Sequence, residues 1–277
     1  MMSRRFTNFR AASIFSAVMA LLVVASSTAL ADPPAAAVAA FNAYSSTVEA
    51  RLAQQHRLPQ AFLAPMADAP QNAMRLRRGE LIVEQLTPAN SATPGSLLHH
   101  WRGTAFAPGA RAEDFEKLMK DFNAYSKYFS PQVLQSKVLA QQGNHFQTTM
   151  RVRQRHVITV VMDTAYDVTF SRLDAHHGYS ISRSTYAAEI DSPGSKSERV
   201  LGSGEEHGFL WRINTYWSYE ERDGGLYMQI ESITLTRSIP TGLAWAVRPF
   251  VESVPRESIE FTLHATCNAL SKQPERN

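Results

Sequence analysis

The residues best suited to bind a ligand in this 277-residue chain gather on one alternating face of a segment around position 220. Asp223-Gly224 is typical of a two-residue β-hairpin turn, and it predicts that Arg222 pairs with Gly225 and Trp217 with Ile230. Side chains alternate between the two faces of a strand. One face of this hairpin then mixes bulky apolar residues with hydroxyls: Trp211, Ile213, Thr215, Trp217, Tyr219, Met228, Ile230, Ser232, Thr234 and Thr236.

We interpret this face as the wall of a pocket for an apolar molecule, because small-molecule sites are mostly apolar with a few placed polar groups. The opposite face carries polar residues such as Arg212, Asn214 and Glu231, so the first face is expected to point inward. The alternative is an ordinary core, in which Ser and Thr bond to the backbone and Trp fills space.

Two further segments extend the predicted pocket. Residues 157–173 place Tyr166 on the same side as Thr164 and Val168. In 179–190, the spacing of Tyr179, Ile181 and Arg183 points Arg183 inward, where a guanidinium needs a charged partner or an anionic head group. A local β-bulge would instead turn Arg183 outward.

Catalytic and metal-binding patterns are not found in the sequence. The pairs His99-His100 and His176-His177 put neighbouring rings on opposite sides of a strand or in a turn, and no His/Cys/carboxylate spacing matches a zinc site. No G-x-S-x-G motif occurs. We therefore predict no catalytic residue, no metal and no cofactor. An enzymatic alternative would use a general base among 205–207, Glu-Glu-His, at the pocket rim.

These candidate residues need a sheet and a covering helix to position them. Apolar spacing predicts a helix over 112–129, which Pro131 ends, and a C-terminal helix over 241–270 in two pieces around Pro249 and Pro255. Alternation and turn residues predict strands at 97–106, 133–140, 146–152, 157–173, 179–190, 209–221 and 226–239. A long antiparallel meander needs another element to cover one of its faces, and we expect the C-terminal helix to cover it.

Two stretches resemble a known family. The segment 121–133, DFNAYSKYFSPQV, and the segment 249–263, PFVESVPRESIEFTL, are similar to START-like proteins, the polyketide cyclase/coenzyme-Q-binding (SRPBCC) superfamily. The resemblance covers about 96–272. It implies an α+β helix-grip fold, in which a curved antiparallel sheet wraps a long C-terminal helix around a ligand cavity. That family contains lipid carriers, quinone binders, cyclases and hydrolases, so the fold does not choose a function.

The N-terminal part has a different composition. Residues 1–31 combine Arg4, Arg5 and Arg10 with an apolar run and an Ala29-Leu30-Ala31 ending, which predicts a signal peptide cleaved near Ala31 and a periplasmic or secreted protein. An uncleaved anchor is the alternative. Residues 32–95 are expected to form a helical appendage with a helix over 38–56 and a short strand at 80–84, and 273–277 a disordered tail.

Charge and cysteine content argue against nucleic acid as a partner and against a disulfide within the chain. The predicted signal holds three of the 28 Lys and Arg and none of the 25 Asp and Glu, so the mature chain would be neutral. Neutrality argues against nucleic-acid binding, which needs surplus positive charge. The single cysteine, Cys267, excludes an internal disulfide.

We expect a carrier of a lipid, isoprenoid, quinone or similar apolar molecule, without an integral span in the mature chain. The alternatives are a cyclase or hydrolase using the same cavity and an envelope interaction module docking through 32–95. The oligomeric state is left open.

Overall fold

A computed structural model describes residues 33–88, 94–155, 159–202, 205–206, 210–238 and 244–272. The expected signal peptide, its cleavage point and the tail at 273–277 lie outside the described residues, as does His207. The elements are α2 (Ala35–Gln55), α3 (Ala69–Arg77), α4 (Ala112–Lys120), α5 (Tyr125–Tyr128) and α6 (Ala244–Ser271), with short 3-10 turns η1 (Pro59–Ala61) and η2 (Phe122–Ala124). The strands are β1 (Ile82–Gln85), β2 (Ser96–Pro108), β3 (Val133–Gln142), β4 (His145–Arg155), β5 (Thr159–Arg172), β6 (His177–Asp191), β7 (Arg199–Val200), β8 (Leu210–Arg222) and β9 (Gly225–Arg237).

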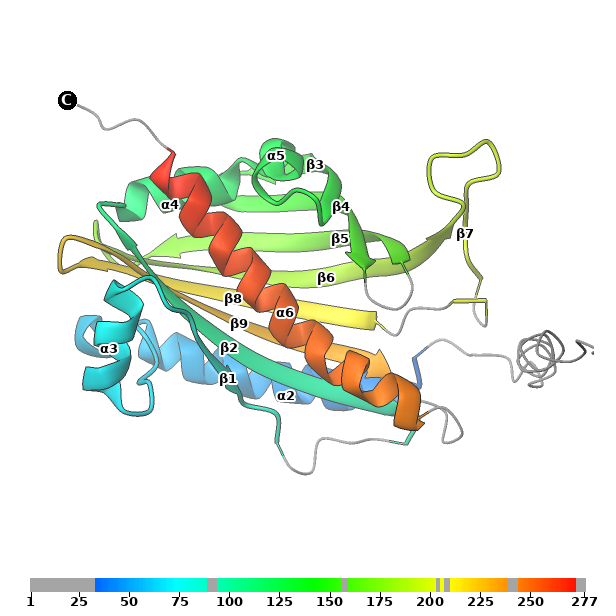
Figure 1. The fold of residues 1–277 in the computed structure, drawn as a ribbon, viewed down its shortest axis with the longest axis horizontal. Helices are drawn as coiled ribbons and strands as arrows, with labels where there is room; N and C mark the ends of the chain where they lie inside the picture. The colour runs from blue at the N-terminus through cyan, green and yellow to red at the C-terminus, as the bar shows by residue number, and fades with distance from the viewer. Residues whose placement is uncertain are drawn as a thin grey trace, which may run out of the picture.

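The strands form one antiparallel sheet in the order β1-β2-β9-β8-β6-β5-β4-β3, with the short β7 paired to β6. Figure 1 shows this curved sheet with α6 lying diagonally across it. The predicted α+β helix-grip fold is confirmed at the level of the fold. None of the helices among the described residues combines the length and the apolarity needed to cross a membrane.

The predicted hairpin turn sets the register of β8 against β9. Asp223 and Gly224 both have positive φ, 56° and 76°, which a two-residue turn of this twist requires. Arg222 pairs with Gly225 and Trp217 with Ile230, as the sequence predicted. The agreement ends at the far end of β8, where a register shift lies between Leu210 and Arg212.

Two predicted helices differ from the observed ones. The helix over 112–129 is interrupted at Asp121, after which η2 and α5 continue the path. Its apolar stripe is nevertheless buried as predicted: Phe115, Leu118, Met119, Phe122, Tyr125 and Phe129. The two-piece prediction for the C-terminal helix is wrong, because α6 is one helix through Pro249 and Pro255. A proline removes one backbone hydrogen bond and can bend a helix without ending it.

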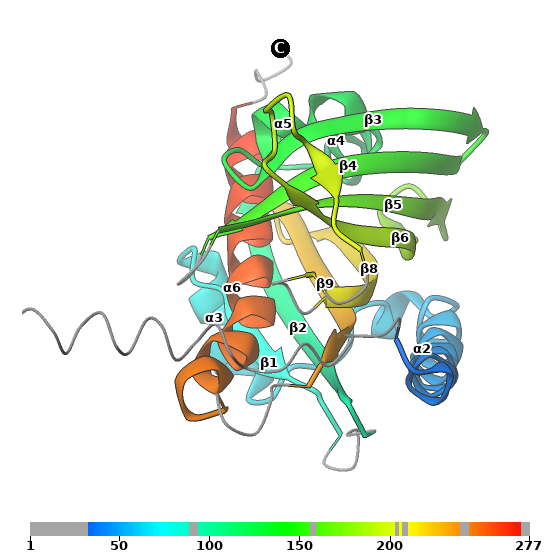
Figure 2. The same ribbon diagram turned by 90° about the vertical axis from the view of Figure 1, so that its right-hand side faces the viewer.

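Around β2, β9 and β8 both faces of the sheet are covered, which the sequence did not predict. Figure 2 shows the sheet between α6 on one side and α2 on the other. We call the face toward α6 the inner face and the face toward α2 the outer face. Phe41, Val48 and Leu52 of α2 are buried against Tyr216 and Ile233 of the sheet. The predicted strand near 80–84 is present as β1, which pairs with β2 at the sheet edge.

Candidate ligand cavity

The close approach of α6 to the sheet depends on a glycine in β2. A Cβ atom added to Gly103 would lie 2.3 Å from Ile259 Cγ2 and 2.7 Å from Leu263 Cδ1. Ile259 and Leu263, which belong to α6, are each at most 2% exposed, and Leu270 further along the same helix is also buried. The absence of a side chain at Gly103 therefore lets the middle of α6 rest directly on β2, while the sheet curves away toward β3.

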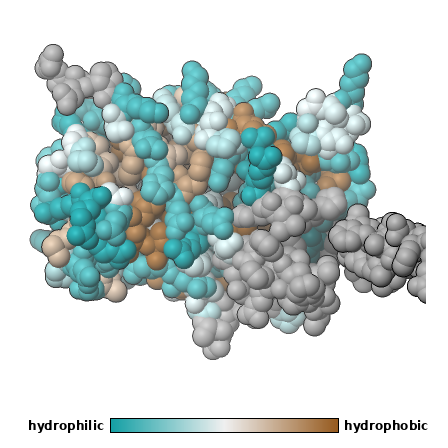
Figure 3. All heavy atoms as spheres, viewed as in Figure 1, coloured by the Kyte–Doolittle hydropathy of each residue, from teal (hydrophilic) through white to brown (hydrophobic). Residues whose placement is uncertain are grey.

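A cavity of about 210 Å³ lies where the sheet curves away from α6. Its walls come from η2, α5, β4, β5, β6, β8, β9 and α6. The lining is mostly apolar and aromatic, and it includes Phe122, Tyr166, Phe170, Trp217, Ile230 and Phe261. Figure 3, seen from the α6 side, shows hydrophobic residues at the surface of this face, interspersed with hydrophilic ones.

Five of the ten residues predicted to bind the ligand line this cavity. They are Tyr166, Ile213, Thr215, Trp217 and Ile230. The turn at Asp223-Gly224 fixes which side of β8 and β9 faces α6, and the alternation of β5 places Tyr166 with Thr164, Val168 and Phe170 on the same wall. Their role in binding a ligand stays a prediction.

Three other predicted residues are on the inner face but outside the cavity. Tyr219 and Met228 pair at the closed end of the hairpin, where both are fully buried. Tyr219 packs on Phe115 and donates its hydroxyl to Glu116 Oε2 at 3.1 Å, and burial raises the pKa of this phenol. Thr234 pairs with Ile213, and its buried hydroxyl has no hydrogen-bond partner among the described residues.

The expectation that Trp211 lines the pocket is wrong. The register shift between Leu210 and Arg212 is a β-bulge, so Leu210 lines the cavity and Trp211 packs in the α2 cluster on the outer face. A bulge adds one residue to a strand and reverses the facing of the residues beyond it. No glycine stands between Phe209 and Ile213 to mark this irregularity.

Arg183 also points to the outer face, so its predicted inward position is wrong. Its guanidinium donates to both carboxylate oxygens of Glu49 in α2, at 2.8 and 2.6 Å. Tyr179 stacks on His56, the residue that caps α2, so the side of β6 that carries Tyr179 and Arg183 faces α2. The prediction that Tyr179 and Arg183 lie on the same side of β6 is correct. An apolar side of a strand indicates the inner face only when the outer face is open to water, and here α2 covers the outer face of β6.

The residues that sequence reasoning missed belong to the other side of β6 and to the helical wall. Ser180 and Ser182 line the cavity, as do Phe122, Tyr125 and Phe129. The sequence predicts the three aromatics as one apolar side of a helix. They line a cavity because space is left between them and the sheet. The two serines could have been found from the alternation of β6 once α2 was known to cover the opposite side.

The cavity has a polar mouth beside α6. A second compartment of about 250 Å³ shares Gln132, Arg153, Gln154, Ser258 and Phe261 with the cavity, and it adds Arg155 and Glu257. Arg153 donates to the carbonyl oxygen of Pro131 at 3.2 Å. A ligand with an apolar body inside could therefore keep a polar end at this mouth.

The lining offers little acid-base chemistry. Among the described residues that line the cavity there is no His, Cys, Asp or Glu. Glu205, suggested as a rim base, is held by Arg199 and by the amide of Gly202, and these contacts lower the pKa of its carboxyl to about 2. Across the described ranges no group of three or more His, Cys, Asp or Glu is arranged to hold a metal ion.

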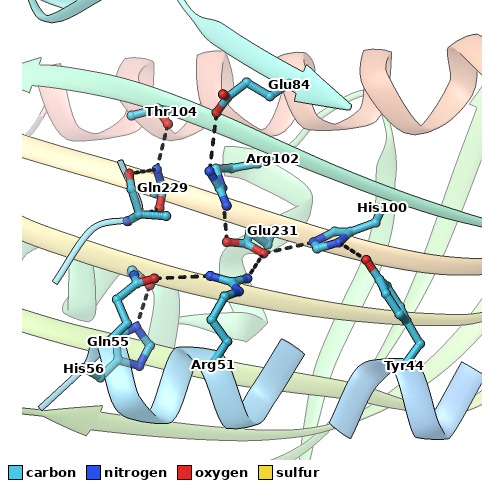
Figure 4. A network of polar contacts seen from close by, with 12 residues as sticks. Tyr44, Arg51, Gln55, His56, Glu84, His100, Arg102, Thr104, Gln229 and Glu231 are labelled. Atoms are coloured by element: carbon cyan, nitrogen blue, oxygen red, sulfur yellow. Dashed lines mark hydrogen bonds and ion pairs between the residues drawn. The ribbon is translucent and has the colours of Figure 1, made fainter. Parts of the chain in front are cut away.

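The outer face carries a buried network of charges (Figure 4). Glu231 is 2% exposed and accepts hydrogen bonds from Arg51 of α2 at 2.5 Å, Arg102 at 3.1 Å and His100 at 2.9 Å. Burial alone would raise the pKa of Glu231, but the bond to His100 and the charges of Arg102 and Arg51 outweigh it and lower the pKa to about 2. Tyr44 of α2 also contacts His100, at 2.8 Å.

Comparisons with known proteins found similar chains among solved structures only. No family model and no curated protein sequence matches the chain. Among solved structures, it is similar to a STAR-related lipid transfer protein from Xanthomonas axonopodis, with 18% identity over 69% of this chain and 99% of that one, and a TM-score of 0.43. It is also similar to an aromatase/cyclase from Streptomyces sp. R1128, with 13% identity over 64% and 95% and a TM-score of 0.44. Human STARD10 matches with 10% identity over 77% and 82% and a TM-score of 0.42. Likeness of this degree says nothing about what the chain binds.

Proposed function

We propose that this protein is an exported binder or carrier of a hydrophobic small molecule, held in the cavity between α6 and the inner face of the sheet. The observation that supports the proposal best is the cavity itself, with an aromatic and aliphatic lining of the kind that small-molecule sites have. Protein interiors are normally filled to the density of organic crystals. A hollow of this size in an otherwise packed core is therefore a feature that needs an occupant.

The volume limits the ligand. An apolar cavity of about 150 Å³ is large enough for benzene. A cavity of about 210 Å³ then holds a body of one or two rings or a short branched chain. A longer molecule, such as an isoprenoid or a single-chain lipid, would extend through the mouth beside Arg153 and Gln154. A two-chain lipid would not be enclosed.

Binding is favoured over catalysis because the described lining of the cavity holds no His, Cys, Asp or Glu, and Glu205 is a poor base with its pKa near 2. An interaction module is less favoured, because α2 and β1 use their apolar sides to pack on the sheet. Export rests on the N-terminal sequence, with its three arginines, apolar run and small-residue ending.

Native mass spectrometry of the purified protein, followed by organic extraction, tests carriage and identifies the cargo. We expect one apolar molecule per chain at close to full occupancy. A protein that carries no ligand and also fails to bind the neutral probe N-phenyl-1-naphthylamine would contradict the proposal. Cell fractionation with an N-terminal sequence of the mature chain tests export, which predicts a chain beginning near Asp32 in the periplasm or medium.

A cavity-filling variant tests the location. Ile213→Trp adds an indole at a lining position, and we expect it to abolish probe binding while the protein stays folded. Leu139→Trp is the matched control, because Leu139 is 58% exposed on the edge strand β3. Equal probe affinities in the two variants would place the binding site elsewhere.

A further inference from the structure

One wall of the cavity carries a row of hydroxyls that the apolar lining does not explain. Ser182 of β6 lies directly opposite Thr215 of β8, and Thr215 lies directly opposite Ser232 of β9. All three residues line the cavity. Residues that face each other on neighbouring strands have Cβ atoms about 5 Å apart. The three hydroxyls therefore form a continuous polar row across three strands. Ser180, which also lines the cavity, pairs with Trp217 beside this row.

These hydroxyls have no hydrogen-bond partner in the described part of the protein. None of Ser180, Ser182, Thr215 and Ser232 makes a side-chain hydrogen bond to any described residue, and none is among the residues with further contacts. Two other hydroxyls of the same cavity behave differently. Thr164 donates to the carbonyl oxygen of Met150 at 3.0 Å, and Thr262 donates to that of Ser258 at 2.7 Å. A hydroxyl in a strand or helix can thus bond to the backbone here, and the four in question do not.

The hydroxyls of this row stay open to the cavity. Ser180 is 3% exposed and Ser232 is 8% exposed, whereas Ser182 and Thr215 are half-buried. None of the four is among the fully buried side-chain oxygens that lack a partner. A hydroxyl that faces a cavity and makes no bond to the described protein can bond to a ligand without losing a protein contact. The grouping of these hydroxyls in one row therefore favours a ligand that bears an oxygen atom.

We propose that the row Ser182–Thr215–Ser232 recognises an oxygen atom in the body of the ligand, so that the ligand class is an apolar ring or short-chain molecule bearing a carbonyl or hydroxyl group, and not a plain hydrocarbon chain. This inference rests on the proposed function, because it names the chemistry recognised in the same cavity. A hydroxyl can donate to a carbonyl or accept from a ligand hydroxyl, so both groups satisfy the row. The row lies on β6, β8 and β9, whereas the arginines at the mouth lie on β4, so the row would contact the body of the molecule.

The test compares two probes that differ by one oxygen, naphthalene and 2-naphthol, whose two rings suit the cavity volume. Dissociation constants are measured by equilibrium dialysis for the wild type and for Thr215→Val, which replaces the hydroxyl with a methyl of the same shape. We expect Thr215→Val to weaken 2-naphthol about three- to tenfold, the effect of one hydrogen bond, and to change naphthalene less than twofold. The double variant Ser182→Ala/Ser232→Ala should show the same selectivity.

Thr148→Val is the matched control. Thr148 is 1% exposed on β4 and its hydroxyl also lacks a partner, but it does not line the cavity. It should leave both affinities unchanged. Equal loss of both probes in Thr215→Val, or unchanged 2-naphthol binding in both the single and the double variant, would overturn the inference while leaving the cavity function standing. A wild type that binds neither probe would overturn the proposed function, and the inference with it.

Discussion

Helices cover the two faces of the sheet in different ways around β2, β9 and β8. The outer face is filled by α2 and joined to it by charge pairs, with Glu231 bonded to Arg51 and Arg183 to Glu49. The inner face meets α6 closely at Gly103 and also borders the cavity with its row of hydroxyls. A face that is packed by a helix and joined to it by ion pairs stabilises the fold, whereas a face that leaves open space beside hydroxyls has room for a small molecule.

The largest effect is expected on the outer face from Glu231→Ala. This change leaves the cations Arg51 and Arg102 without their shared carboxylate, and Arg102 is only 9% exposed. Breaking a buried ion pair by removing one partner costs about 3–5 kcal/mol. We expect a loss of that size in urea unfolding, with the probe affinity of the remaining folded protein unchanged.

Glu80→Ala is the matched control for that experiment, since Glu80 pairs with Arg75 at the surface with 42% of its side chain exposed. Exposed pairs contribute about 0–1 kcal/mol. Similar losses from both substitutions would show that the network around Glu231 is not the connection that stabilises the outer face.

The pH dependence of stability should also trace to the outer face, through His56. Burial between α2 and the sheet, together with the charge of Arg51, lowers the pKa of His56 from 6.5 to about 4. The unfolded chain therefore takes up a proton below pH 6.5 that the folded protein does not, so stability falls as the pH drops from 6.5 to 4. The loss is about 2–3 kcal/mol. Urea unfolding at several pH values measures it. His56→Gln should flatten the curve in this range, and an equally steep curve in the variant would contradict the assignment.

On the inner face, Gly103→Ala tests the contact that holds α6 to the sheet. The new Cβ would lie within 2.7 Å of both Ile259 and Leu263. Overpacking of this kind costs about 1–3 kcal/mol. We expect lower stability together with altered probe affinity, because displacement of α6 changes the cavity. Lower stability with unchanged affinity would separate the cavity from the position of α6.

The smallest effect is expected at the mouth. Arg153→Gln removes a cation near the cavity entrance. We expect an anionic probe, 1-anilinonaphthalene-8-sulfonate, to bind about two- to threefold more weakly at low salt, and neutral N-phenyl-1-naphthylamine to bind as before. Arg57→Gln, an exposed arginine outside the cavity lining, is the control. A change of equal size in Arg57→Gln would mean that net charge, and not the mouth, attracts the anion.

Much of the fold could be predicted from local sequence. Asp223-Gly224 set the pairing of β8 with β9, and this pairing placed Thr215, Trp217 and Ile230 correctly toward α6. Alternation within β5 did the same for Tyr166. These predictions held because a turn and a strand period are properties of neighbouring residues.

The errors came from contacts between distant parts of the chain. The position of Trp211 depends on a bulge in β8, and that of Arg183 depends on α2 covering β6 more than a hundred residues away in sequence. A strand buried on both faces loses the contrast between an apolar and a polar side, so its facing cannot be read from alternation. The volume of the cavity was also beyond prediction, since it depends on how far α6 stands from the sheet.

The most direct test of the account compares two tryptophans of the same strand. Trp217 lines the cavity and Trp211 packs against α2, and both are less than 10% exposed. Trp217→Ala and Trp211→Ala should each lower stability by about 3–5 kcal/mol. Titration with N-phenyl-1-naphthylamine, at a temperature where both variants are folded, should show weaker binding in Trp217→Ala and wild-type binding in Trp211→Ala. Equal losses in the two variants, or a loss confined to Trp211→Ala, would contradict a ligand cavity on the inner face.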